Sequence, residues 1–246
     1  MKSVYCIIPA RYHSTRLPGK PLADIAGKPM VQRVYEQALK AKLPQKVIVA
    51  TDHEDIFAAV KDFGGEVVMT SPEHPTGTDR LAEVAAKYSE AEIIINIQGD
   101  EPEIDPQVID RLIEPFLKSE DLSMATVITS MAVDEMEQPG CVKVVVDQQG
   151  KALYFSRSLI PYLRSGERLV PVYKHIGIYG YRRDFLLKFA KLSPTPLEQM
   201  ESLEQLRALE YGYGIQTIQV EHSAIGVDTP EDLAAINEKF KKMEGK

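Results

Sequence analysis

Residues 93–102 have the sequence Ile-Ile-Ile-Asn-Ile-Gln-Gly-Asp-Glu-Pro, a β-branched run that leads directly into polar residues. Such a run is typical of a strand buried on both faces of a parallel sheet. Asp105 and Pro106 follow and are typical of a helix start, and apolar residues then recur at helical spacing to Leu117. The stretch therefore predicts a strand, a polar loop and a covering helix, the repeating unit of an α/β fold.

The same alternation extends toward the N-terminus. Three further segments have strand character: residues 4–9, 46–50 and 66–69. Each precedes a segment with helical periodicity, and these lie at about 28–41, directly after Asp52 and at about 78–88. Asp52 is expected to cap the second of these helices. This order predicts a mostly parallel sheet with helices on both faces.

The pattern changes after about residue 122. Four segments have strand character with few helices between them: residues 123–133, 142–147, 151–156 and 172–181. A hairpin turn is expected at 147–150, which makes this region an antiparallel lobe. One helix is expected near 197–211, and another begins after Thr229, its predicted N-cap.

These changes predict two parts within a single structural unit. The core comprises residues 1–122 and 212–246, and the lobe comprises residues 123–211. No repeat, low-complexity tract or long linker separates them.

The composition is that of a folded protein, with 246 residues, 44% hydrophobic and 26% charged. The two cysteines, Cys6 and Cys141, are expected to be reduced and buried. No apolar run approaches the ~20 residues of a membrane span, and no signal-peptide core follows the first residues, so we expect a cytoplasmic protein. The net charge of −7 argues against general nucleic-acid binding.

Basic residues nevertheless gather near the N-terminus, since residues 1–33 hold six Lys or Arg against one acidic residue. The loop after the first strand carries groups that suit phosphates: Arg11, Ser14, Thr15, Arg16 and Lys20. A loop in this place lies at the carboxyl end of the parallel sheet, where ligands bind in such folds. The residue types alone fit a triphosphate site and an ordinary solvated loop equally well. The loop is neither a Walker A motif nor a GxGxxG motif.

Two aspartates are candidate Mg²⁺ ligands. Asp100 follows the buried strand, and Asp228 directly precedes the predicted cap Thr229. The alternative interpretations are a turn residue for Asp100 and an auxiliary cap for Asp228. Spacing in the sequence leaves open whether the fold brings the two carboxylates together.

The strands and the last helix of the lobe carry a third group of polar residues. Arg157 ends one strand, and His175 and Tyr179 share one face of another. They could receive an anionic sugar, and the alternative is a structural role. Glu204 and Arg207 interrupt the apolar stripe of the 197–211 helix, either as a buried pair or with the carboxylate facing a polyhydroxylated ligand.

Six motifs follow one another in a fixed order: PARYxSTRLPGKPL at 9–22, QGDEP at 98–102, ALYFSR at 152–157, HIGIY at 175–179, LEQLR at 203–207 and GVDTPEDL at 226–233. With these motifs the chain resembles, along almost its whole length, the 3-deoxy-manno-octulosonate (KDO) cytidylyltransferases, or CMP-KDO synthetases. The resemblance implies a nucleotide-diphospho-sugar transferase-like, Rossmann-like fold. It also implies transfer of CMP from CTP to the anomeric 2-hydroxyl of KDO, with release of pyrophosphate.

The resemblance further implies a Mg²⁺ requirement, a bacterial cytoplasmic setting, supply of lipopolysaccharide or capsule precursors, and a homodimer formed through the lobe. The nearest alternative is a cytidylyltransferase for another acidic sugar, either 8-amino-KDO or a sialic acid. A glycosyltransferase of similar fold fits less well, because the chain has no Asp-x-Asp motif. An inactive nucleotide sensor also fits less well, because the phosphate and metal residues are all present.

The resemblance assigns three sets of site residues. The catalytic set is Arg11, Lys20, Asp100 and Asp228, with the two aspartates as Mg²⁺ ligands. The nucleotide-binding set is Pro9, Ala10, Arg11, Lys20, Gly77, Thr78, Arg80 and Gln98. The sugar-acid set is Gln98, Arg157, His175, Tyr179, Glu204 and Gln205.

Overall fold

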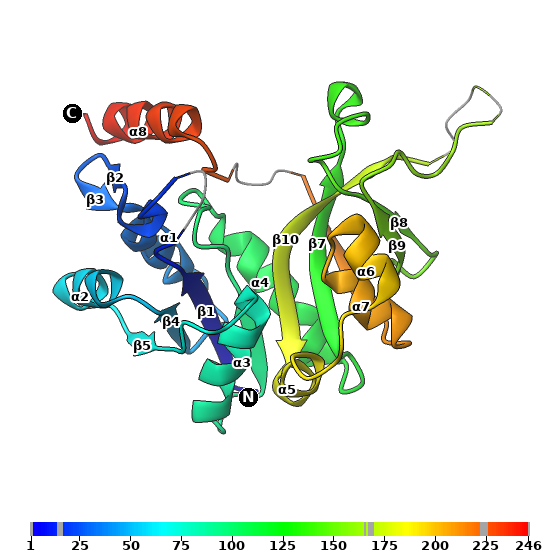
Figure 1. The fold of residues 1–246 in the computed structure, drawn as a ribbon. Helices are drawn as coiled ribbons and strands as arrows, with labels where there is room; N and C mark the ends of the chain where they lie inside the picture. Colours follow the sequence, from blue (N-terminus) through cyan, green and yellow to red (C-terminus); the bar gives the residue numbers. More distant parts are fainter. Residues whose placement is uncertain (1, 14–16, 165, 167–169, 222–225, 246) are drawn as a thin grey trace.

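The computed structural model describes residues 2–13, 17–164, 166, 170–221 and 226–245. Within them a nine-stranded sheet is covered by helices on both faces (Figure 1). The expected α/β class is therefore confirmed. None of the helices in these residues is long and apolar enough to cross a membrane.

The strands of the described chain are β1 (Val4–Ala10), β2 (Asp24–Ile25), β3 (Lys28–Pro29), β4 (Lys46–Thr51), β5 (Val67–Met69), β6 (Ile93–Asn96), β7 (Met124–Ser130), β8 (Lys143–Val146), β9 (Ala152–Ser156), β10 (Tyr173–Arg182) and β11 (Ile215–Val220). The helices are α1 (Met30–Ala38), α2 (Glu54–Asp62), α3 (Gly77–Lys87), α4 (Pro106–Lys118), α5 (Arg183–Phe189), α6 (Pro196–Glu201), α7 (Gln205–Glu210) and α8 (Pro230–Glu244), with the short 3₁₀ helices η1 (Lys20–Leu22) and η2 (Val133–Glu135).

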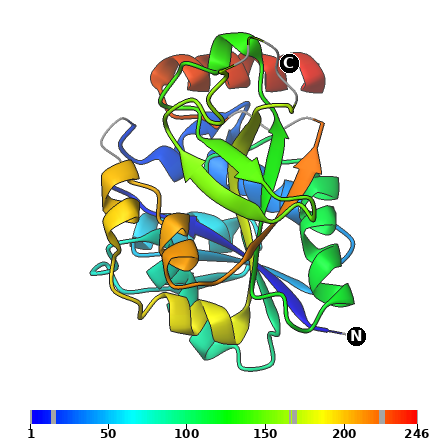
Figure 2. The same cartoon turned by 90° about the vertical axis from the view of Figure 1, so that its right-hand side faces the viewer.

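The main path of the sheet has the strand order β11-β7-β10-β6-β1-β4-β5. β1 pairs in parallel with β4 and β6, and β4 pairs in parallel with β5. β10 is antiparallel to both β6 and β7, and the β8–β9 hairpin extends the antiparallel pairing from the first half of β10. Figure 1 shows α2 and this hairpin at opposite sides of the molecule, and in Figure 2 the hairpin faces the viewer.

The antiparallel region predicted after residue 122 is thus present, but β7 and β10 extend the main sheet itself. The division into a core and a lobe stays a prediction, since the sheet passes through both parts.

Alternation along β1 explains why helices cover both faces. Cys6 and Ile8 pack into a cluster with side chains from α1, α2 and α4, while Tyr5 and Ile7 pack with side chains from α3, α5 and α7. A strand that is buried on both sides needs apolar residues at nearly every position. Strands β1, β4, β5 and β6 were predicted to within a few residues, whereas the two-residue strands β2 and β3 were not predicted, and β3 lies in the segment that was expected to begin the helix at about 28–41.

Helix α2 begins differently from the prediction. Its N-cap is His53, whose Nδ1 accepts a hydrogen bond from the Asp55 amide at 3.3 Å. The Asp52 carboxylate lies 2.6 Å from Nη2 of Arg80, a fully buried side chain. The predicted Asp52 cap was wrong because a buried guanidinium requires a charged partner more strongly than a helix end requires a cap.

The helix predicted near 197–211 is two helices, α6 and α7. Ser202 ends α6 in the left-handed region with a φ of 51°. Across this break Arg207 Nε donates to Glu198 Oε2 at 2.8 Å, whereas Arg207 Nη2 is 3.9 Å from Glu204 Oε1. The single-helix premise was wrong, and the principal partner of Arg207 is Glu198.

Two smaller expectations have mixed outcomes. Cys6 is buried as expected, whereas Cys141 is half-buried, and both are free thiols. Thr229 caps α8 as expected, in a capping box with Asp232. Helix α8 buries Ile236 and Phe240 in a small cluster that includes Ile25 of β2 and Met30 of α1.

Candidate active site

The candidate active site lies at the topological switch point of the sheet, between β1 and β6. From β1 the chain moves to β4 and β5 on one side, and later places β6 on the other side. Such a switch point leaves a crevice at the carboxyl ends of the strands. A cavity of about 420 Å³ is found there, lined by Pro9, Ala10, Arg11, His13, Lys20, Pro21, Gly77, Gln98, Gly99, Asp100 and Asp228. We call it the nucleotide cavity.

A close backbone approach builds one wall of this cavity. The Ile97 amide donates to the Ile7 carbonyl at 3.0 Å, which continues the β1–β6 pairing beyond the strand. At Gly99 a Cβ atom would lie 2.7 Å from the Pro9 carbonyl oxygen. Because that oxygen belongs to the backbone of a central strand, the position requires glycine. Gln98 and Asp100 flank this glycine and line the cavity.

Asp100 and Asp228, which are far apart in the sequence, lie together. The Val227 amide donates to the Asp100 carbonyl at 2.9 Å and so ties the two segments to each other. The Asp228 amide donates to Asp232 Oδ2 at 3.0 Å, which links this residue to the start of α8. The fold thus brings the two carboxylates to one cavity, as their proposed role in metal binding requires.

Lys20 lies between these carboxylates. Its Nζ donates to Asp100 Oδ2 at 2.6 Å and to Asp228 Oδ1 at 3.0 Å. The side chain of Lys20 is 13% exposed, compared with 30% for Asp100 and 45% for Asp228. Lys20 thus brings one positive charge to these two carboxylates.

The loop that carries Lys20 is closed at Tyr12. The Gly19 amide donates to the Tyr12 carbonyl at 3.1 Å, and Gly19 adopts a φ of 67° that suits glycine. The Tyr12 ring stacks on the ring of His53 with centroids 3.8 Å apart and planes 13° apart. The predicted phosphate-binding residues Ser14, Thr15 and Arg16 lie outside the described residues.

Arg11 connects the nucleotide cavity with a second one. Its Nη1 donates to the Pro75 carbonyl at 3.2 Å. Burial, and then the neighbouring Arg80 guanidinium, lower the pKa of Arg11. The second cavity has a volume of about 590 Å³ and is lined by Arg11, Pro75, Thr76, Gly77, Glu198, Gln199, Ser202, Leu203 and Glu204. We call it the sugar cavity. Arg11 and Gly77 line both.

The predicted nucleotide-binding residues divide into two groups. Pro9, Ala10 and Gly77 line the nucleotide cavity, as do Arg11, Lys20 and Gln98. Thr78 and Arg80 lie behind this lining. Thr78 Oγ1 donates to Glu204 Oε2. Arg80 binds Asp52 and Thr70, so it links α3 to the ends of β4 and β5.

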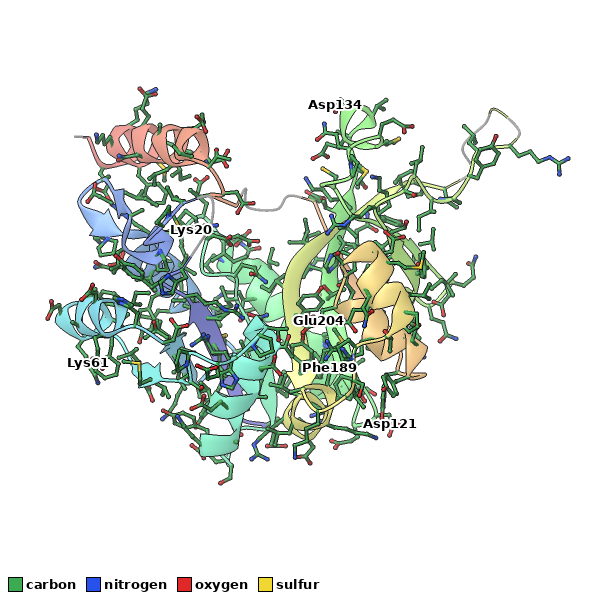
Figure 3. The ribbon with its side chains drawn as sticks, viewed as in Figure 1. Lys20, Lys61, Asp121, Asp134, Phe189 and Glu204 are labelled. Carbon is green, nitrogen blue, oxygen red and sulfur yellow. The ribbon has the colours of Figure 1, made fainter. Side chains whose placement is uncertain are left out.

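Glu204 is the predicted sugar-acid residue that lines the sugar cavity. Figure 3 shows it beside α6, whereas Lys20 lies on the α8 side of the molecule. Burial raises the pKa of Glu204. Glu204 Oε1 and the buried Gln205 Nε2 have no hydrogen-bond partner within the described part of the chain. Unpartnered buried polar atoms are costly unless a ligand or water satisfies them.

The other predicted sugar-acid residues are engaged with the protein itself. Gln98 Nε2 donates to the Gly177 carbonyl. Arg157 donates to three backbone carbonyls, those of Glu201 at 2.7 Å, Pro139 at 3.1 Å and Ser202 at 3.3 Å. Among the described residues, the linings of the nucleotide and sugar cavities do not include Arg157.

His175 and Tyr179 lie behind the same two linings. His175 Nε2 is 3.0 Å from Thr126 Oγ1, and burial lowers the pKa of His175 to about 3. At neutral pH its ring is uncharged, which limits it to hydrogen bonding rather than charge attraction. Burial and the nearby Glu204 raise the pKa of Tyr179, so this phenol stays protonated.

Sequence reasoning missed two acidic residues next to the cavities. Glu101 is buried, and burial together with the Asp100 carboxylate raises the pKa of Glu101 to about 8. Its place directly after a buried strand and Asp100 was the available signal, but no role was predicted for it. Glu198 lines the sugar cavity and binds Arg207. The capping-box spacing of Thr195 and Glu198 was the available signal, and the Thr195 amide donates to Glu198 Oε2 at 3.0 Å.

A third cavity, of about 600 Å³, lies far from this chemistry. It is lined mainly by the end of α4 and by residues next to β11, including Arg111, Glu114 and Lys118. Glu114 and Lys118 lie 3.6 Å apart on one face of α4, and Arg111 donates to the Gln219 carbonyl at 2.7 Å. These three charged side chains thus have local partners, and the size of the cavity alone does not indicate an active site.

The nucleotide cavity suits a Mg²⁺ ion by the chemistry of its donors. Asp100 Oδ2 and Asp228 Oδ1 are hard oxygen ligands that already lie within 3.0 Å of one cationic nitrogen. Within the described residues no group of three or more His, Cys, Asp or Glu side chains could hold a metal. A site with two protein carboxylates fits Mg²⁺, which usually keeps waters and substrate phosphates as its remaining ligands.

The chain is similar to known cytidylyltransferases along nearly its whole length. The sequence model of the cytidylyltransferase family matches residues 5–221. The 3-deoxy-manno-octulosonate cytidylyltransferase of Geobacter sulfurreducens is 52% identical, over 97% of this chain and 100% of its own length. The enzyme of the same name from Acaryochloris marina is 48% identical over 94% of each chain.

Solved structures agree with these relatives. A structure of CMP:2-keto-3-deoxy-manno-octonic acid synthetase complexed with CTP has a TM-score of 0.95 and 46% identity, covering 98% of this chain and 100% of that chain. A 4-diphosphocytidyl-2C-methyl-D-erythritol synthase from Anaerococcus prevotii has a TM-score of 0.66 at 13% identity, covering 98% of this chain and 99% of that chain. The latter likeness concerns the fold alone.

Proposed function

This chain belongs to the 3-deoxy-manno-octulosonate (KDO) cytidylyltransferases, and we propose how its two cavities serve the reaction of that family. The enzyme transfers CMP from CTP to KDO and releases pyrophosphate. Its fold is of the nucleotide-diphospho-sugar transferase type. The names of its relatives do not favour the alternative acidic sugars, 8-amino-KDO and sialic acids.

The nucleotide cavity is the proposed CTP site. Arg11 and Lys20 line it from one side and would bind the triphosphate, since guanidinium and ammonium groups are the usual partners of phosphate oxygens. The backbone of Pro9 and Ala10 and the start of α3 at Gly77 would receive the cytosine ring. Arg80 supports this wall from behind through its contacts with Asp52 and Thr70.

Asp100 and Asp228 are the proposed ligands of Mg²⁺. Their shared position beside one cavity is the single observation that carries this proposal. When bound, Mg²⁺ would supply Lewis-acid stabilisation of the phosphate charge.

The protein contributes mainly positioning and charge neutralisation. In the transfer, the 2-hydroxyl oxygen of KDO forms a bond to the α-phosphorus of CTP and releases its proton to solvent, and the bond from that phosphorus to the bridging oxygen of pyrophosphate breaks. Arg11 and Lys20 would stabilise the charge on the leaving pyrophosphate. Arg11 lines both cavities, so it lies where the two substrates would meet. Alignment of the two reactants supplies much of the acceleration in reactions of this class.

The sugar cavity is the proposed KDO site. The orphaned atoms of Glu204 and Gln205 are suited to hydroxyl groups, which both donate and accept hydrogen bonds. Glu204 lines the cavity, whereas Gln205 lies next to it in the chain. Arg157 would reach the KDO carboxylate by giving up carbonyl partners, and His175 and Tyr179 would contribute hydrogen bonds.

We also propose a homodimer formed through the antiparallel region. Large apolar side chains are exposed there in the described residues: Val133, Leu153, Tyr162, Leu163 and Val170. Several apolar groups exposed in one region are typical of an interface. Sedimentation of the wild type and of Leu153→Asp with Tyr162→Asp tests this, with a dimer and a monomer as the expected species. A monomeric wild type contradicts the proposal.

The proposed setting is the cytoplasm, where CTP is available, and the proposed role is supply of CMP-KDO for lipopolysaccharide or capsule. The central test is pyrophosphate release from CTP, Mg²⁺ and KDO. Parallel reactions replace KDO with N-acetylneuraminate, or CTP with ATP, GTP or UTP. We expect release with CTP and KDO alone. Release with a different sugar acid would preserve the nucleotide site and overturn the sugar assignment, and no release from folded protein would contradict the enzyme itself.

A further inference from the structure

Lys20 occupies the place that two carboxylate ligands would give to a metal ion. Its ammonium nitrogen is 2.6 Å from Asp100 Oδ2 and 3.0 Å from Asp228 Oδ1. Asp100 lies 80 residues from Lys20 in the sequence and Asp228 lies 208 residues away, so the fold alone brings the three together. A lysine expected on the phosphates of CTP is thus held by the proposed Mg²⁺ ligands.

We propose that Lys20 is the resident counter-ion of Asp100 and Asp228 in the nucleotide-free enzyme, and that it exchanges this position for the triphosphate when CTP binds. The divalent cation then takes the place that the ammonium leaves. This inference rests on the proposed function for the identity of the nucleotide and the metal. It adds that Lys20 and the metal compete for the same two oxygens.

Charge balance explains why CTP binding would move Lys20 from the aspartates to the phosphates. Two carboxylates close together repel each other unless a cation lies between them, and Lys20 supplies that cation in the absence of ligands. A triphosphate brings several negative charges to the same cavity and offers the ammonium equally charged partners. Once the ammonium moves to the phosphates, Asp100 Oδ2 and Asp228 Oδ1 lose their contact with Lys20, and a divalent cation would bind the same two oxygens.

The local structure permits this movement. Lys20 begins η1 directly after Gly19, whose left-handed conformation turns the loop into the short helix. Only side-chain torsions need to change, because Lys20 already lines the cavity that Arg11 also lines. Both of the observed contacts of its Nζ are to side-chain carboxylates, not to backbone carbonyls. Side-chain partners at 30% and 45% exposure are accessible to an incoming ion.

The exchange couples the two ligands. Because nucleotide and metal each favour the state in which Lys20 has left the carboxylates, the binding of one strengthens the binding of the other, and linkage makes the effect reciprocal. The free enzyme therefore binds divalent cations weakly, while its aspartates remain ionised and oriented. If the metal bound at other oxygens, away from Lys20, removing the lysine charge would leave its affinity nearly unchanged.

The test is a titration of the nucleotide-free protein with Mn²⁺, followed by electron paramagnetic resonance of the free ion. It compares the wild type with Lys20→Met, which removes the charge at similar size, and with Lys20→Arg, which keeps the charge. We expect Lys20→Met to bind Mn²⁺ at least tenfold more tightly than the wild type, and Lys20→Arg to resemble the wild type. Lys20→Gln replaces Lys20→Met if that variant does not fold.

A second substitution locates the effect. Adding Asp228→Asn to Lys20→Met should abolish the gain in Mn²⁺ affinity, and a gain that persists would overturn the assignment to this site. Equal Mn²⁺ affinities of the wild type and the neutral variants would overturn the competition itself. The pyrophosphate assay separates this failure from that of the proposed function: an active wild type with unchanged Mn²⁺ affinity in Lys20→Met refutes the exchange alone. An inactive wild type refutes the function.

Discussion

The nucleotide cavity and the sugar cavity share Arg11 and Gly77, but Lys20 and Arg157, the cations proposed to bind their two ligands, contact different kinds of partner. In the nucleotide cavity, Lys20 pairs with side-chain carboxylates that come from distant segments. On the sugar side, the Arg157 guanidinium donates to three backbone carbonyls, and burial holds the pKa of His175 at about 3. Ligands can replace side-chain partners by small rotations, whereas backbone carbonyls move only with their element.

The type of a residue alone therefore does not show whether its side chain is available to bind a ligand. Lys20 is ready to exchange partners. Arg157 holds the end of α6 through the carbonyls of Glu201 and Ser202, and Ser202 lines the sugar cavity. We therefore expect substitutions in the nucleotide cavity to affect the chemical step, and substitutions on the sugar side to affect the shape of the KDO site.

The largest expected effect is at the aspartates. Asp100→Asn and Asp228→Asn each remove one charged oxygen ligand and should lower kcat by about 10²–10³-fold, comparable to the loss of one preorganised electrostatic contact in other enzymes. Steady-state pyrophosphate release at saturating CTP and KDO measures this. The thermal unfolding midpoint should remain close to that of the wild type, since both side chains are partly exposed.

Asp134→Asn is the matched control. Asp134 lies in η2, outside both cavities (Figure 3), and the same change of charge there should leave kcat unaltered. Activity close to that of the wild type in either Asp100→Asn or Asp228→Asn would remove that residue from the metal site and weaken the contrast between the two cavities.

Arg157 is expected to show the next largest effect. Arg157→Ala removes a guanidinium that holds three carbonyls, and hydrogen bonds to charged groups contribute about 1.5–3 kcal/mol. We expect KM for KDO to rise by about 10–100-fold, the factor that this energy represents, with KM for CTP nearly unchanged. Initial rates with each substrate varied separately measure both constants.

Arg157→Lys distinguishes charge from geometry. A lysine keeps the positive charge but cannot reach three acceptors as a planar guanidinium does. Recovery of KM for KDO in this variant would indicate that charge toward the KDO carboxylate matters most. No recovery would indicate that the hold on α6 matters most, and equal rises in both KM values in Arg157→Ala would contradict the assignment of Arg157 to the sugar side.

The sequence predicted those features of the two cavities that depend on neighbouring residues, and did not predict contacts between residues far apart in the chain. The β-branched strands and the capped helices of the first half were predicted because their signals are local. The type of residue at Lys20, Asp100 and Asp228 was also evident. Their contact was not, because it depends on β6 lying beside β1 and on α8 returning to the same edge.

Tertiary partners explain the errors in the same way. Asp52 precedes a helix and would cap it in isolation, but the buried Arg80 on α3 takes its carboxylate. Residues 197–211 have helical spacing, but Ser202 leaves the helical region and Glu198 takes Arg207. A one-dimensional pattern carries no information on partners that arrive from another element, so such residues are misassigned even where the element is correctly predicted.

The pH dependence of stability tests whether the His175 ring is neutral in the folded protein. Burial lowers the pKa of His175 to about 3 from its ordinary value of 6.5. Below pH 6.5 the unfolded chain binds a proton that the folded protein does not, so stability decreases as the pH falls. At pH 5 this amounts to about 2 kcal/mol. Urea unfolding at pH 7 and pH 5 should therefore show a smaller decrease in His175→Gln than in the wild type.

Comparing the decrease in stability of the two proteins excludes a contribution from other groups, because carboxylates that titrate in this range are common to both proteins. Parallel decreases in the wild type and in His175→Gln would mean that the folded protein protonates this ring readily. His175 would then carry a charge toward the KDO carboxylate, and the contrast between the charged Lys20 and a neutral His175 would no longer hold.

The smallest expected effect concerns the support of the loop that carries Lys20. The His53 ring has two functions, since it stacks on Tyr12 and its Nδ1 caps α2. His53→Ser keeps a capping oxygen and removes the ring, whereas His53→Phe keeps a ring and removes the cap. Aromatic pairs contribute about 0.5–1.5 kcal/mol beyond their buried area, so His53→Ser should raise KM for CTP by about 2–10-fold.

The two variants should therefore show opposite patterns. His53→Phe should retain the wild-type KM for CTP and lose about 1 kcal/mol of stability in urea, because a helix cap is lost. His53→Ser should retain stability, and KM for KDO should be unchanged in both, because Tyr12 closes the loop next to the nucleotide cavity alone. An unchanged KM for CTP in His53→Ser would show that the backbone contact of Gly19 with Tyr12 holds the loop without the stacked ring. The readiness of Lys20 to exchange partners would then depend on the turn at Gly19 and not on α2.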